Sequence, residues 1–140
     1  INLIPISRKP NPESLDLDDT MTLSKAFMDL GNNIIIFPEG SRGEVGKIQR
    51  FRKGAVKFSM GLDVPILPAA IMGAEKAWPK GEKFIKPFPI TVKVLPKIDP
   101  PKTEELSKTA YNKALSKITK ELEIKISEAV KELEETKNPD

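Results

Sequence analysis

Residues 37–42, FPEGSR, place a carboxylate, a glycine, a hydroxyl and a guanidinium directly after an apolar run. A glycine allows the backbone to approach a ligand closely, and the planar guanidinium of arginine binds phosphate or carboxylate bidentately. Glu39 is suited to order Arg42 or to bind a hydroxyl of a second substrate. The alternative is an ion pair between Glu39 and Arg42 that only stabilises a turn. The stretch thus predicts either an anion-binding site or a structural ion pair.

Two catalytic motifs that overlap this stretch are incomplete. A phosphate-binding P-loop in GSRGEVGK requires glycine where Ser41 stands and Ser or Thr where Ile48 stands. A nucleophile elbow in EGSRG requires glycine where Glu39 stands. The sequence contains no histidine and no cysteine, so these residues form neither a Ser-His pair nor a thiolate nucleophile. The stretch therefore predicts neither of these catalytic motifs, and an anion-binding site and a structural ion pair both stay open.

The net charge of +3 is unevenly distributed. Residues 1–40 carry 3 basic and 6 acidic side chains, residues 41–100 carry 12 and 5, and residues 101–140 carry 8 and 9, which gives −3, +7 and −1. Between residues 42 and 57 six cations accompany a single acid. Such a density indicates an anionic partner, which is a phosphate, a nucleotide, a lipid headgroup or a nucleic acid. A solvated basic face is the alternative.

Length and composition favour one soluble globular domain, with 140 residues, 39% hydrophobic and 31% charged. No apolar run approaches the roughly 18 residues of a membrane span, and no signal peptide is recognisable. The absence of cysteine fits a reducing compartment. Because the chain opens with Ile1 inside an apolar stretch, we expect it to be part of a longer protein.

The apolar patterns predict an α/β fold with a sheet flanked by helices. Strands are expected at residues 2–6, 33–37, 64–72 and 90–94, and the run at 33–37, IIIF with its flanking residue, is typical of a strand buried on both faces. A helix is expected at residues 20–30, with Asp19 or Thr20 as N-cap and Gly31 as its stop, and another at residues 53–60. The segment 74–87 is expected to be a loop.

Residues 101–140 predict a long amphipathic helix. Apolar residues recur at steps of three and four from Leu106 to Leu133, and Thr103 is the expected N-cap. A helix of about 30 residues is on the order of 45 Å long. It either covers the sheet or contacts a partner helix or a membrane surface.

Four blocks of the sequence together resemble the glycerolipid acyltransferase family, the enzymes that acylate lysophosphatidic acid and its relatives. FPEGSR resembles the family's third conserved block, and LIPISR at residues 3–8 resembles the second. FRKGA at residues 51–55 is similar to the basic stretch that follows, and VPILPA at residues 64–69 is similar to the fourth block. The blocks stand in the family's order and cover roughly residues 1–75.

The resemblance implies an acyltransferase domain whose C-terminal part occupies residues 1–100, with residues 101–140 as the amphipathic helix of the same domain. It implies that substrate is bound by Arg8, Phe37, Pro38, Glu39, Gly40, Ser41, Arg42, Lys53, Gly54 and Pro68. The family's first block, Asn-His followed by Asp, supplies the catalytic base and would lie upstream of Ile1. No catalytic residue is therefore assigned in this chain, and we expect this fragment alone to be inactive. No metal or organic cofactor is implied.

The partners implied are a lysophospholipid acceptor, with lysophosphatidic acid as the expected one, and acyl-CoA or acyl-carrier protein as donor. We expect a peripheral protein at the cytoplasmic face of the membrane, held to anionic lipid by electrostatics. The loop with Trp78, Lys76, Lys80 and Lys83 either touches headgroups or is an ordinary loop. A noncatalytic module that binds acidic phospholipid is the alternative function. Nucleic acid is not expected as a partner, because the sequence carries no nucleic-acid-binding motif.

Overall fold

The structure is a computed structural model that describes residues 17–41, 43, 47–104 and 106–137. It divides into two compact units between Ile36 and Phe37. The predicted strand at residues 2–6 lies outside the described residues, as do Arg8 and Arg42.

The first unit contributes one described helix, α1 (Leu17–Asp29). The predicted helix is confirmed, but it begins three residues earlier than expected, so Asp19 lies in its first turn and Thr20 within it, and neither is the N-cap. Acidic residues in a first turn stabilise the helix dipole. Gly31 ends the helix as predicted: its φ is 81°, and its N–H donates to the Met28 carbonyl at 2.8 Å.

The predicted buried strand at residues 33–37 is wrong, because the structure shows no strand there. Ile35 is 81% exposed and Phe37 is 68% exposed. A strand is held by a ladder of hydrogen bonds to a neighbouring strand, and no described segment pairs with these residues. Apolar composition indicates that a segment is suited to a sheet, but it does not supply the partner.

The described sheet has two antiparallel strands, β1 (Ala69–Met72) and β2 (Thr91–Val94), in the register Ala69↔Val94 to Met72↔Thr91. Both lie where strands were predicted. Strand β1 covers only the second half of the predicted 64–72 segment, and an isolated bridge, Ile66↔Ile98, continues the pairing before it. Proline has no N–H to donate to a ladder, so Pro65 and Pro68 explain the interruption.

A short helix, α3 (Ala74–Ala77), occupies the start of the segment that was expected to be a loop. Gly73 precedes it with a φ of 93°, and its N–H donates to the Glu75 carboxylate at 2.9 Å. A single helical turn carries too little periodicity to be recognised in a sequence.

The long C-terminal helix is confirmed as α4 (Lys108–Lys137), 30 residues. Its N-cap is Ser107 rather than Thr103, because the Ser107 hydroxyl accepts the Ala110 N–H at 3.3 Å and the Ser107 carbonyl accepts the Tyr111 N–H at 2.9 Å. Thr103 instead begins a separate turn that its carbonyl closes with the N–H of Leu106.

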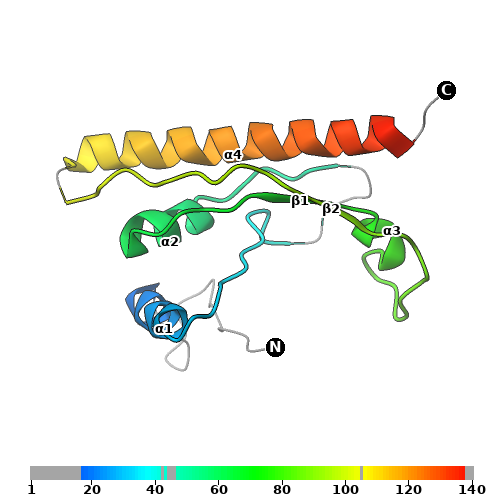
Figure 1. Cartoon of the computed structure of the whole chain (residues 1–140), viewed down its shortest axis with the longest axis horizontal. Coiled ribbons are helices and arrows are strands. Elements are labelled where there is room, and N and C mark those ends of the chain that lie inside the picture. The colour runs from blue at the N-terminus through cyan, green and yellow to red at the C-terminus, as the bar shows by residue number, and fades with distance from the viewer. Residues whose placement is uncertain (1–16, 42, 44–46, 105, 138–140) are drawn as a thin grey trace. The chain divides into compact units, whose positions relative to one another are not determined.

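The core of the second unit lies between α4 and α2 (Gly54–Leu62). Its buried members are Phe51, Val56, Met60, Leu115, Ile118 and Leu122. Helix α4 also packs against β1. It therefore runs along the two-stranded sheet β1–β2, which we call the ribbon, with α2 and α3 at opposite ends (Figure 1). The α/β class and the covering role of the helix are thus confirmed. Within the described residues no helix is both long and apolar enough to cross a membrane.

The corrected cap of α4 gives a direct test. Ser107→Ala removes the side-chain acceptor for the Ala110 N–H, so we expect the free energy of unfolding to fall by about 0.5–1 kcal/mol. Thr103→Ala is the matched control and should change it by less than ~0.5 kcal/mol. Urea unfolding followed by circular dichroism measures both. A larger loss of unfolding free energy in the Thr103 variant would mean that Thr103 is the N-cap.

Candidate functional site

The motif FPEGSR begins with a tight turn over Phe37–Gly40. The Gly40 N–H donates to the Phe37 carbonyl at 3.0 Å, with Pro38 and Glu39 at the two corner positions. Proline presets the backbone angle needed at the first corner, and Gly40 has a φ of 72°, which glycine adopts without strain. The polar residues of the motif are therefore carried by a turn that the sequence specifies locally.

Two hydrogen bonds tie this turn to the segment that leads into the FRKGA motif. The Glu39 carboxylate oxygen Oε2 accepts the backbone N–H of Gln49 at 2.7 Å. The Pro38 carbonyl accepts the backbone N–H of Arg52 at 2.8 Å. The structure thus ties the FPEGSR turn to the segment that leads into FRKGA, through residues ten positions apart in the case of Glu39 and Gln49. It also gives Glu39 a structural partner beside its predicted role toward substrate.

The FRKGA motif is in turn attached to α4. The Phe51 ring is buried in the core, and its backbone N–H donates to the Glu123 carboxylate Oε2 at 2.8 Å. The Lys53 ammonium donates to the Ser116 hydroxyl at 2.8 Å. A hydroxyl does not neutralise the ammonium, so Lys53 retains its positive charge for a ligand.

The start of α2 is open and basic. Lys53 is its N-cap residue and provides no side-chain hydrogen bond to the first turn, and a Cβ placed on Gly54 would meet no atom within 4 Å. Arg50, Arg52 and Lys53 are exposed, and none of the three is in an ion pair within the described part of the chain. Helix N-termini and cations both attract phosphate, so this arrangement is suited to an anionic ligand.

The remaining predicted site residues that the structure describes are in the FPEGSR turn and in the segment before β1. Ser41 and Phe37 are exposed. Pro68 is buried, and its carbonyl accepts the Leu95 N–H at 2.9 Å, which places it in the framework of the ribbon. The structure therefore supports a shared location for the FPEGSR turn and the start of α2, and it gives Pro68 a packing role.

Three contact residues were not predicted from the sequence: Gln49, Ser116 and Glu123. Gln49 acts through its backbone, which no side-chain motif reveals. Glu123 is half-buried and directly follows Leu122 of the apolar stripe. An acid beside the buried stripe of a helix is a weak signal, because it does not reveal which backbone group the acid accepts from.

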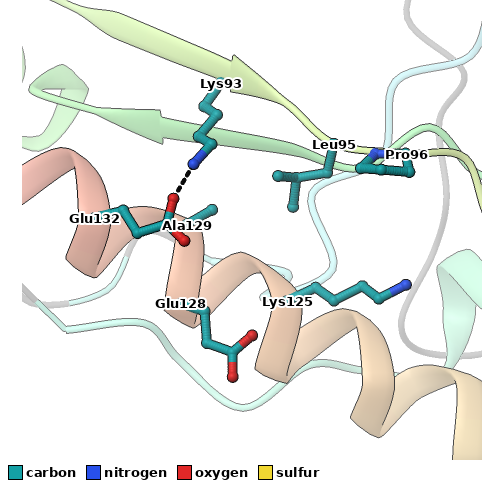
Figure 2. A pocket seen from close by; sticks show the side chains of 7 residues that line it. All are labelled: Lys93, Leu95, Pro96, Lys125, Glu128, Ala129 and Glu132. Carbon is teal, nitrogen blue, oxygen red and sulfur yellow. Dashed lines mark hydrogen bonds and ion pairs between the residues drawn. The ribbon is translucent and has the colours of Figure 1, made fainter.

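A hollow lies between β2 and the second half of α4 (Figure 2). It is lined by Lys93, Leu95, Pro96, Lys125, Glu128, Ala129 and Glu132. Lys93 and Glu132 form an ion pair across it, and its two lysines are balanced by two glutamates. Its lining is thus neutral and unsuited to hold a phosphate.

Among the described residues, no group of three or more Asp or Glu side chains is placed to bind a metal ion.

Comparison with protein families supports the resemblance of the motifs. A family model described as Acyltransferase matches residues 1–72, which include the FPEGSR, FRKGA and VPILPA segments.

Individual proteins are also similar to this chain. A 1-acyl-sn-glycerol-3-phosphate acyltransferase of Limnanthes douglasii is 42% identical over 67 residues, 48% of this chain and 24% of the relative. One of Cocos nucifera is 31% identical over 104 residues, 74% of this chain and 32% of the relative. The crystal structure of the 1-acyl-sn-glycerophosphate (LPA) acyltransferase, PlsC, from Thermotoga maritima matches with a TM-score of 0.50 and 28% identity, over 75% of this chain and 44% of that one. The chain spans less than half the length of each.

The two carboxylate-to-backbone contacts predict a stability effect. Glu39→Ala and Glu123→Ala each leave a partly buried N–H without its charged acceptor, so each should lower the free energy of unfolding by about 1.5–3 kcal/mol. Glu121→Ala removes only the surface pair with Lys125 and should cost less than ~1 kcal/mol. Urea unfolding of the three variants checks this. If all three variants unfolded alike, Glu39 would have no structural role.

Proposed function

The chain belongs to the acyltransferase family, and we propose that the full-length protein transfers a fatty acyl group to the free hydroxyl of lysophosphatidic acid. The relatives that it resembles are named 1-acyl-sn-glycerol-3-phosphate acyltransferases. The observation that carries the proposal is the connection of the FPEGSR turn to the open, basic start of α2.

Acyl transfer to an alcohol requires a base for the hydroxyl, a stabilised oxyanion and an anchor for the acceptor. The residues of this chain are suited to the third task. Lys53 and Arg52 flank the uncapped first turn of α2, so an acceptor phosphate placed there meets cations and backbone N–H groups together. Arg42 follows the turn in sequence and is assigned to the same phosphate. The chain has no histidine, so it does not itself supply an imidazole base.

The donor in this proposal is acyl-CoA or acyl-carrier protein, and the reaction belongs to phospholipid biosynthesis. Because the acceptor is a membrane lipid, the protein would act as a peripheral protein at the cytoplasmic face of the membrane. The net charge of +7 over residues 41–100 favours an anionic surface there.

A noncatalytic module that binds acidic phospholipid is the second candidate, favoured by the same concentration of charge. The sequence upstream separates the two. Asn-His followed four residues later by Asp would supply a base and supports the enzyme. The absence of that block from the full-length sequence would support the binding module.

Arg42 provides the first functional test. In the full-length protein, Arg42→Ala should lower kcat/KM for lysophosphatidic acid by roughly 10- to 100-fold, the effect of losing a charge-assisted hydrogen bond. Lys97→Ala is the control, because it removes an exposed cation that pairs with Asp99 and lies outside the proposed site. Unchanged kinetics with reduced thermal stability would make Arg42 structural.

Gly54 provides a test that separates ligand approach from folding. Because a Cβ at this position meets open space, Gly54→Ala should leave the free energy of unfolding unchanged or raise it by up to about 1 kcal/mol. The added methyl group would stand where the phosphate approaches the first turn of α2, so KM for the acceptor should rise. Full activity in this variant would place the phosphate elsewhere.

A further inference from the structure

The segment between α3 and β2, residues 78–90, exposes a group of large apolar side chains. Phe84 is 80% exposed and Ile85 is 71% exposed, and Trp78, Phe88 and Ile90 are between 40% and 54% exposed. We call this segment the α3–β2 loop. Contiguous exposed apolar side chains of this size mark an interaction surface or a membrane contact.

The loop is held in a defined conformation, so the exposure is not that of a loose chain. The Lys86 N–H donates to the Ala77 carbonyl at 2.8 Å, which closes the loop at its base. The Trp78 indole N–H donates to the Glu82 carbonyl at 2.8 Å. A Cβ on Gly73 would lie 2.2 Å from the Pro89 carbonyl oxygen, so the returning arm packs closely against that glycine.

Lysines are interleaved with these apolar residues. Residues 74–90 contain four lysines and two glutamates, a net charge of +2. Both acids are engaged, Glu82 in an ion pair with Lys86 at 3.4 Å and Glu75 with the Gly73 N–H. Lys80 and Lys83 are in no ion pair within the described part of the chain. The Lys76 ammonium lies 5.3 Å from the centre of the Phe88 ring.

We propose that the α3–β2 loop inserts into the surface of an anionic lipid bilayer, with Phe84 and Ile85 entering the boundary of the acyl chains. Tryptophan is enriched at the headgroup level of a bilayer, apolar side chains such as phenylalanine reach the boundary with the acyl chains, and lysines beside them bind anionic headgroups. The inference rests on the proposed function, because an enzyme that acylates a membrane lipid has to reach that surface.

This proposal departs from the expectation of purely electrostatic membrane binding. That expectation assumed that no strongly apolar surface accompanies the lysines, whereas the α3–β2 loop presents both at one place. The ribbon also exposes apolar side chains, namely Ile71, Val92 and Val94. The lysine next to them in sequence, Lys93, is paired with Glu132 (Figure 2). The combination of apolar and cationic groups that fits a lipid surface therefore distinguishes the loop from the ribbon.

Two isoleucines allow a matched test in the full-length protein. Ile85→Ser changes the loop, and Ile124→Ser makes the same change at an exposed position (47%) on α4. With vesicles of phosphatidylcholine and about 30% phosphatidylglycerol, we expect Ile85→Ser and Phe84→Ser each to weaken binding roughly 3- to 10-fold. Ile124→Ser should bind like the wild type. Equal binding by the Ile85 and Ile124 variants would overturn the inference.

Salt and a local probe test the two parts of the mechanism separately. Raising salt to about 0.5 M screens the lysines, so wild-type binding should weaken but persist, and the residual binding should be lost in Ile85→Ser. An environment-sensitive fluorophore on Phe84→Cys should shift to the blue only when vesicles are added, and one on Ile124→Cys should not shift. A blue shift at position 84 without vesicles would mean that protein covers the loop, and it would overturn the inference.

Acyl transfer to a short-chain, freely soluble lysophosphatidic acid separates this inference from the proposed function. We expect Ile85→Ser to retain the wild-type rate on that substrate, since no bilayer has to be reached. If the wild-type protein transferred no acyl group, the proposed function would fail while the vesicle results stood. If Ile85→Ser bound vesicles normally, the loop assignment would fail while acyl transfer stood.

Discussion

The backbone from Ile48 to Arg52 belongs to no helix or strand, so its N–H groups have to find partners outside regular secondary structure. Glu39 takes the N–H of Gln49, and Glu123 takes the N–H of Phe51. These two carboxylates come from opposite directions in the chain, one from the FPEGSR turn and one from α4. The position of the turn relative to the start of α2 therefore depends on a short irregular segment that is held from both sides.

Sequence patterns predicted the elements that are stabilised by contacts between residues near in the sequence. The stripe of α4 and the glycine that ends α1 are visible in single segments, and the structure contains both. The segment 33–37 failed for the opposite reason, because a strand is a property of two segments. Isoleucine is common in sheets, and yet Ile35 is exposed, because no described segment forms the hydrogen-bond ladder of a strand with it. The difference lies in whether the stabilising partner is near in the sequence.

The same distinction holds for the candidate site. Resemblance of four short blocks predicted which residues bind substrate, and the turn at Phe37–Gly40 follows from its own proline and glycine. What fixes that turn was not predictable, because Glu123 lies 72 residues from Phe51 and Gln49 contributes only a backbone group. Those contacts depend on the packing of α4 on α2, which brings position 123 beside position 51. Composition contains no information on that register.

The distribution of charge along α4 shows which force sets the packing of α4 on α2. Residues 108–120 contain four lysines and no acid, and residues 121–137 contain six glutamates and three lysines. Lysines near a helix N-terminus oppose its dipole, at about 0.3–1 kcal/mol each when they lie in the first turn, whereas burial of one leucine contributes about 1.5–3 kcal/mol. The buried stripe around Leu115 thus outweighs the unfavourable charge order and keeps the basic half of α4 against α2, where Lys53 bonds Ser116. A carboxylate at that point would neutralise Lys53 and compete with an incoming phosphate. A hydroxyl holds the lysine in place without neutralising its charge.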